Sequence, residues 1–230
     1  MGLQILLDKI NGKKAAALIN DGQLIDFLVE NDLPGPGTIF LAKANRVVKN
    51  LGGVFVSLPE GQGFLKRTKK IALGEECLVQ VHGYSTIGKA IPVTSKLILK
   101  SRYVIVTPHN PGINISRSIK NSKIRTNILK KVIASLQGCD FGIVLRTNCE
   151  LADTEVILED VHAVLERTKK VLRHRESGPR LILASETPHQ LAWRDWPIRA
   201  RVISHAGCFE ENNLLDQLLT ICAPEVKRET

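Results

Sequence analysis

The sequence predicts a mixed α/β protein, with helices and sheets partly segregated (α+β) and a small curved β-barrel in its middle. Three observations predict this. The first 30 residues hold short apolar segments separated by Asn11-Gly12 and Asp21-Gly22, which are typical hairpin turns. Residues 38–66 alternate apolar and polar side chains with the period of half-buried strands. From Tyr103 onward, apolar strands alternate with amphipathic segments of helix length.

The barrel segment carries two phenylalanines among cations. Phe55 follows a pair of glycines, and Phe64 comes nine residues later, after a turn at 59–63, while Lys43 is interleaved in the preceding strand. Strands over 77–82 and 89–99 are expected to complete the barrel. Rings beside cations suit single-stranded nucleic acid, because every base can stack and every phosphate is negative. The alternative is that both rings are ordinary core residues.

The positive charge is concentrated in one half of the chain. The net charge is +9, but residues 37–149 alone carry 18 Lys and Arg against four acidic residues, and the remainder is slightly acidic. This separation favours a polyanionic partner, first of all nucleic acid, with an anionic membrane surface or an acidic protein as alternatives. Lys66 and Arg67 begin a basic cluster in a loop, which fits a clamp on a nucleic-acid backbone or a role in solubility alone.

Composition excludes several other classes of protein. The five cysteines are scattered and never spaced Cys-x-x-Cys, which argues against a structural zinc site and a disulfide framework and fits a reducing compartment. No long apolar run or signal peptide is evident, so we expect a cytoplasmic protein without membrane contact. The six histidines are isolated, which leaves an unrelated metabolic enzyme without a metal or nucleophile constellation.

The second half of the chain is expected to alternate strands and helices. A helix capped by Asn121 or Ser122 should run to about Leu136, and a longer one should run from Asp153 or Thr154 to Gly178-Pro179. The remaining expected elements are strands at 103–107, 113–116, 142–147, 181–184 and 201–204, and helices near 188–194 and 210–221.

Arg146 and Thr147 stand at the end of an apolar strand. A guanidinium offers a planar fork to phosphate oxygens, and the neighbouring hydroxyl can donate to a third oxygen. The pair could therefore hold a terminal phosphate. Equally, Arg146 could cap a helix end or pair with Glu150 or Glu155.

Several motifs in one order carry a resemblance to a known family. They are Gly-Val-Phe-Val at 53–56, Gly-Phe-Leu at 63–65, Gly-Lys-Ala at 88–90, Tyr-Val-Ile-Val-Thr-Pro-His-Asn-Pro at 103–111, Ile-Ser-Arg at 115–117, Gly-Ile-Val-Leu-Arg-Thr at 142–147 and Ala-Trp-Arg-Asp-Trp at 192–196. Together they resemble the N-terminal half of the RNase E/RNase G family of bacterial endoribonucleases, in particular its shorter, alphaproteobacterial type.

The resemblance implies an OB-type RNA-binding domain inserted into an RNase H-like α/β scaffold, beside a region that senses a 5′ monophosphate on RNA. The implied parts are 1–36 and 179–230 for the scaffold, 37–100 for the OB fold and 101–178 for the sensor. By position, the resemblance gives Phe55 and Phe64 an RNA-stacking role and gives Lys89 an RNA contact. It likewise assigns the 5′ phosphate to Arg146 and Thr147, with Arg117 as a looser basic match.

The chain departs from the family in two places. Where the family's 5′ pocket has a glycine, Ser101 and Arg102 occur, and Arg102 is an added cation that could compensate. The family's two magnesium-binding aspartates and its zinc link belong to a later domain that these residues do not match. We therefore expect no cofactor in this chain, Mg²⁺ only in the complete nuclease, and single-stranded RNA, with or without a 5′ monophosphate, as the partner. Either the chain is the RNA-binding and 5′-sensing portion of an endoribonuclease, truncated or completed by a second polypeptide, or it is an RNA-binding protein without catalysis. A homo-oligomer or a separate catalytic portion is the further partner that we expect.

Overall fold

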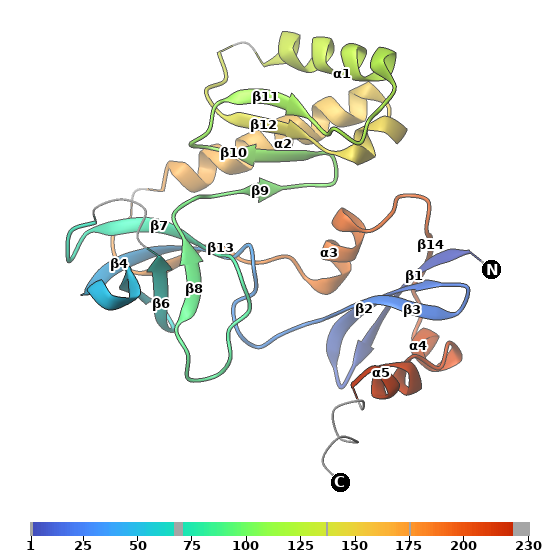
Figure 1. Cartoon of the computed structure of the whole chain (residues 1–230), viewed down its shortest axis with the longest axis horizontal. Helices are drawn as coiled ribbons and strands as arrows, with labels where there is room; N and C mark the ends of the chain where they lie inside the picture. The colour runs from blue at the N-terminus through green and yellow to red at the C-terminus, as the bar shows by residue number, and fades with distance from the viewer. Residues whose placement is uncertain (1, 67–70, 137, 175, 223–230) are drawn as a thin grey trace. The chain divides into compact units, whose positions relative to one another are not determined.

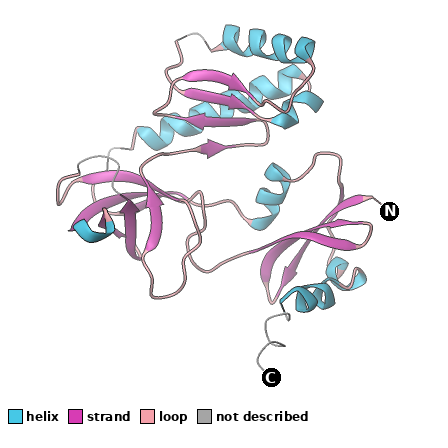
Figure 2. Cartoon of the chain, in the orientation of Figure 1, coloured by secondary structure: helices cyan, strands magenta, loops and turns pink. Residues whose placement is uncertain are grey.

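The computed structural model describes residues 2–66, 71–136, 138–174 and 176–222 (Figure 1). The chain divides into two compact units. The first combines Met1–Asp32 with Glu186–Thr230, and the second is Leu33–Ser185. The second unit is therefore inserted into the first along the sequence. Figure 2 shows that both units mix helices and strands.

The first unit is a four-stranded sheet with helices against both faces. Strands β1 (Leu3–Ile10), β2 (Lys13–Asn20) and β3 (Gln23–Val29) form the expected antiparallel meander, and β14 (Arg201–Ile203) pairs in parallel with β1. One face packs Ala17 and Ile19 against α4 (Cys208–Glu211) and α5 (Leu214–Cys222). The other packs Ala16 and Leu18 against the segment of α3 (Pro188–Asp195).

A closed β-barrel of five strands opens the second unit. It consists of β4 (Ile39–Val48), β5 (Gly53–Leu58), β6 (Gly61–Lys66), β7 (Glu76–Val81) and β8 (Ile91–Thr94). The strands pair in the order β4-β5-β6-β8-β7, and β7 pairs with β4 to close the ring. Pairing is antiparallel except between β6 and β8, and a short 3-10 turn, η1 (Lys49–Leu51), links β4 to β5. The barrel is therefore OB-like, and closure leaves no free edge.

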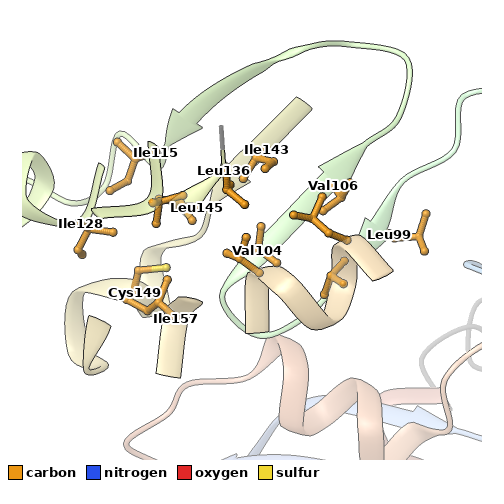
Figure 3. Packing of buried hydrophobic residues seen from close by; sticks show 14 of the residues in the cluster. Leu99, Val104, Val106, Ile115, Ile128, Leu136, Ile143, Leu145, Cys149 and Ile157 are labelled. Atoms are coloured by element: carbon orange, nitrogen blue, oxygen red, sulfur yellow. The ribbon is translucent and has the colours of Figure 1, made fainter. Parts of the chain in front are cut away.

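A second sheet follows the barrel. Its strands are β9 (Leu99–Lys100), β10 (Val104–Thr107), β11 (Gly112–Ile115) and β12 (Gly142–Leu145), in the order β11-β12-β10-β9. Helices α1 (Ser122–Ser135) and α2 (Thr154–Leu172) share one core with it, and η2 (Thr147–Leu151) follows β12. Figure 3 shows Val104, Leu145 and Ile157 within this core. A Cβ on Gly142, the first residue of β12, would lie 1.8 Å from the Asn110 carbonyl oxygen in the turn before β11. The close approach of this turn to β12 therefore requires glycine at position 142.

Several expected boundaries differ from the structure. The strand expected over 89–99 is two strands, β8 and β9, and the long helix ends at Leu172 rather than at Gly178-Pro179. The helix expected over 210–221 is split into α4 and α5, where Asn213 takes a φ of 49°. Strand β13 (Arg180–Leu183) pairs with β4, so the second unit extends to Ser185 instead of ending near 178.

Candidate nucleic-acid interface

Phe55 and Phe64 lie on the outer face of the barrel. Their neighbours Val54, Val56 and Leu65 point inward and are buried in the barrel core, so side-chain alternation turns both rings outward. The two residues face each other across β5 and β6, with ring centroids 5.4 Å apart and planes inclined by 64°. Both rings are only half-buried. They form a surface pair, and the alternative of two interior core residues does not hold.

Cations surround this pair. The Arg46 guanidinium lies 5.0 Å from the centroid of the Phe55 ring, which is cation–π geometry. Lys43 pairs with Ser57, and Lys66 pairs with Gly53, so strand register places both lysines on the same outer face. Both are exposed. The sequence pattern includes Arg46 among the cations interleaved in this strand but not among the predicted RNA-binding residues, although Arg46 touches the stacking pair directly.

Gly53 makes room for the Phe64 ring. A Cβ at this position would lie 2.3 Å from Phe64 Cζ and 2.8 Å from the Leu65 carbonyl oxygen. Only a residue without a side chain leaves room for the ring beside the start of β5. The glycine therefore shapes the aromatic surface and does not act merely as a turn residue.

Lys89 lies in the loop between β7 and β8. It is exposed, and its amide closes a turn on the Thr86 carbonyl at 3.1 Å. No strand register fixes its side chain against the rings. Arg67, predicted to bind the RNA backbone, lies outside the described residues.

The predicted phosphate-binding residues gather at the ends of β11 and β12. The Ser116 and Thr147 hydroxyl oxygens are 2.9 Å apart, and the Ser116 amide donates to the Leu145 carbonyl. These bonds bring Thr147 beside the Ser116-Arg117 turn. Arg117 and Thr147 are exposed, so the two predicted residues border one surface.

Arg146 and Arg102 form the cationic part of this cluster. The Arg146 Nη1 donates to the Ser101 carbonyl at 2.6 Å, which directs its guanidinium toward the segment that holds Arg102. Arg102 is buried, and burial lowers its pKa; the charge of Tyr103 raises it and the positive charge of Arg146 lowers it further. The two guanidinium groups repel each other, so a bound anion would stabilise the positive charge of both.

Two further side chains hold the cluster in shape. Arg125 of α1 donates to the carbonyls of Ile115 and Ser116, at 3.2 and 2.8 Å. Asp160 of α2 accepts from the Ser101 hydroxyl and from the Tyr103 amide. Neither was predicted from the sequence, since each reaches the cluster across the fold. Of the acidic partners proposed for Arg146, Glu155 pairs instead with Lys131 at 3.4 Å.

The cluster offers no nucleophilic thiol. Burial raises the pKa of Cys149 to about 12, with Asp160 adding to the rise, while hydrogen bonds and Arg146 oppose it. The thiol is therefore protonated at neutral pH and serves as a small apolar residue of the core. Within the described part of the chain, no three His, Cys, Asp or Glu side chains gather as metal ligands. No helix among those residues is both long and apolar enough to cross a bilayer.

An OB-like barrel with paired rings and cations on its outer face is an arrangement typical of proteins that bind single-stranded nucleic acid. Comparisons with known proteins show which family this chain resembles. Residues 98–206 match the model of the Ribonuclease E/G family, and the chain is similar to this family over that part.

Relatives match over a longer stretch. Ribonuclease E of Nostoc sp. is 27% identical over 199 residues, which cover 78% of this chain and 29% of the relative. Ribonuclease E of Synechocystis sp. is 22% identical over 74% of this chain and 28% of its own length. A ribonuclease E/G-like protein of Pyropia yezoensis is 23% identical over 66% of this chain and 33% of its own length.

The chain thus spans about a third or less of these relatives. They come from cyanobacteria and a red alga. The narrower resemblance to the alphaproteobacterial type has no support among them.

Proposed function

We propose that this chain binds single-stranded RNA across the outer face of its barrel, as the N-terminal portion of an RNase E/G-type endoribonuclease in RNA processing and decay. One observation carries the proposal. Phe55 and Phe64 form a half-exposed pair, covered at one end by the Arg46 guanidinium and flanked by lysines. Stacking on such rings contributes about 1–3 kcal/mol per base, and the cations attract the phosphates between the bases.

The proposal also covers the order of the two units along the sequence. The first unit is continuous in space but split in sequence, with the barrel and second sheet inserted between β3 and α3. This supports an RNase H-like scaffold interrupted by an OB-type domain. The parallel pairing of β14 with β1, which joins the two sequence segments of the first unit, also supports this scaffold assignment.

The cluster at the ends of β11 and β12 is proposed as the 5′-phosphate site. Arg146 would present its guanidinium to the phosphate, Thr147 would donate its hydroxyl, and Arg117 and Arg102 would supply further positive charge. The cluster is held by backbone carbonyls and by Asp160, so its shape does not depend on the ligand. Such preorganisation lowers the entropic cost of binding.

The proposal assigns RNA binding to the surfaces described above and cleavage to the complete nuclease. In the complete nuclease, bound Mg²⁺ would supply an activated water. This chain would bind and orient the RNA and its 5′ end. Incubation with a 5′-monophosphorylated single-stranded RNA and Mg²⁺ should leave the RNA intact, and cutting by this chain alone would contradict the assignment. An RNA-binding protein without any catalytic portion shares the same binding surface and the same expectation.

The 5′-phosphate site is tested with two RNAs that differ only at the 5′ end. The wild-type chain should bind the 5′-monophosphate form about 10-fold more tightly than the 5′-hydroxyl form, because a charge-assisted fork contributes about 1.5–3 kcal/mol. Arg146→Ala should remove the preference. Arg199→Ala, which deletes the same charge from an exposed site of the other unit, should retain it. Equal binding of both RNAs by the wild-type chain would refute the site.

A further inference from the structure

The strand register of the barrel continues the aromatic pair into a longer row. Arg46 pairs with Phe55, Phe55 with Phe64, and Phe64 with Pro92 on β8. The amide of His82, which follows β7, donates to the Pro92 carbonyl at 3.1 Å. Five consecutive positions thus lie side by side across all five strands of the barrel.

The whole row faces outward. Val93 and Val81, the neighbours of Pro92 and His82, are paired with each other and buried in the barrel core. Alternation along each strand therefore directs Pro92 and His82 away from that core. His82 is exposed and Pro92 is half-buried, which matches the exposure of Arg46 and of the two phenylalanines.

The row is long enough for more than the two rings. Adjacent strands are about 4.8 Å apart, so the three steps from Phe55 to His82 cover about 14 Å. The phenylalanine centroids alone span 5.4 Å. Because strands in a closed barrel are tilted, a row across them climbs along one side instead of circling the barrel. A single extended strand of RNA could follow it.

We propose that the base-stacking surface continues past Phe64, over the Pro92 ring to the His82 imidazole, and takes at least one further base of a single-stranded RNA. This inference rests on the proposed function, since it extends the same surface. Flat rings of proline and histidine offer the faces that a base requires.

The loop after His82 supports a ligand at this end of the row. A Cβ on Gly83 would lie 3.5 Å from Pro92 Cγ, so the loop begins directly against the proline ring. Beyond it, Tyr84 is 61% exposed and Ile87 is 92% exposed, so the loop presents two large side chains to solvent beside the row. Lys89 follows in the same loop. In OB-like barrels, the corresponding loop between the fourth and fifth strands is one of those that bind oligonucleotides.

A scan of single abasic substitutions along a 5′-hydroxyl octaribonucleotide tests the extension. Affinities are measured by fluorescence anisotropy for the wild-type full-length chain, His82→Ala, His82→Phe, His82→Lys and Phe64→Ala. His162→Ala is the matched control, because this exposed histidine of α2 lies outside the row. We expect His82→Ala to weaken binding about 5-fold and His82→Phe to restore it. Removing one particular base should then cost affinity in the wild-type chain but not in His82→Ala.

The outcomes separate this inference from the proposed function. Wild-type affinity in His82→Ala, with weakened binding in Phe64→Ala, would mean that the surface ends at Phe64 and that only the extension is wrong. Restoration by His82→Lys as well as by His82→Phe would assign a charge contact and overturn stacking. Wild-type affinity in both Phe64→Ala and His82→Ala would overturn the function and the extension together.

Discussion

Gly53→Ala should disturb RNA binding by displacing Phe64, although Gly53 has no side chain of its own to contact RNA. The new methyl group would lie 2.3 Å from Phe64 Cζ, whereas ordinary contacts begin at 3.4 Å, so the ring must retreat by about 1 Å. The Leu65 carbonyl oxygen, at 2.8 Å, is backbone of the paired strand and cannot turn away. Overpacking of this kind costs about 1–3 kcal/mol of stability.

The same displacement should weaken RNA binding. Phe64 would leave its edge-to-face position against Phe55, and the loss should approach the ~1–3 kcal/mol of one stacked base. Urea unfolding and anisotropy with a 5′-hydroxyl single-stranded RNA measure the two effects. Gly2→Ala is the control, since its methyl group would meet nothing within 4 Å and lies in the other unit.

A double variant completes this test. In the Phe64→Ala background, Gly53→Ala should weaken RNA binding little further, because the ring that it displaces is already absent. Additive losses would show that Gly53 acts on binding by another route. If Gly53→Ala kept both the wild-type urea midpoint and the wild-type affinity, the described packing of Phe64 over β5 would be refuted.

Two further predictions concern the same surface, and a third concerns the core of the second sheet. Arg46→Ala should weaken RNA binding by about 0.5–2 kcal/mol, and Arg46→Lys should recover only part of it, because lysine lacks the planar group that stacks on Phe55; equal affinities of wild type and Arg46→Ala would contradict this. The affinity for single-stranded RNA should fall with salt at a log–log slope of about −3.5 if about five phosphates are neutralised, and a slope near zero would exclude an electrostatic interface. Cys149, with its pKa raised to about 12, should react with iodoacetamide at pH 8 only when the chain is unfolded, as mass spectrometry of the peptide can show.

Local features of the fold could be predicted from the sequence. Asn11 and Gly12 both take positive φ values, as the hairpin signal requires. Asn121 caps α1 by accepting from the amides of Lys123 and Ile124, and the alternating pattern of 38–66 forms three strands of the barrel. In each case the information lies within a few residues of the element that it specifies.

The pairing of Arg46 with Phe55 shows why other features could not be predicted. Counting by twos from Phe40, Ala42 and Ala44 points Arg46 into the barrel, but the register shifts between Ala44 and Arg46. The shift turns Arg46 outward, opposite Phe55. A β-bulge has no reliable signal in a single sequence, since it depends on the partner strand.

Strand pairings between segments far apart in the sequence could not be predicted either. The parallel pairing of β6 with β8 and the addition of β13 to β4 join segments far apart in sequence. The row from Phe64 to His82 exists only because of the first of these pairings. Arg125 likewise reaches the cluster at the ends of β11 and β12 from a helix. It does so through backbone carbonyls that no sequence pattern identifies.

The central claim is that the outward rings bind unpaired RNA, and one comparison tests it most directly. The affinity of the wild-type chain for a 5′-hydroxyl single-stranded RNA is measured beside that of a Phe55→Ala/Phe64→Ala variant that melts cooperatively. The account predicts that the variant binds at least 10-fold more weakly, in line with about 1–3 kcal/mol for each stacked base. Unchanged affinity in the folded double variant would contradict it.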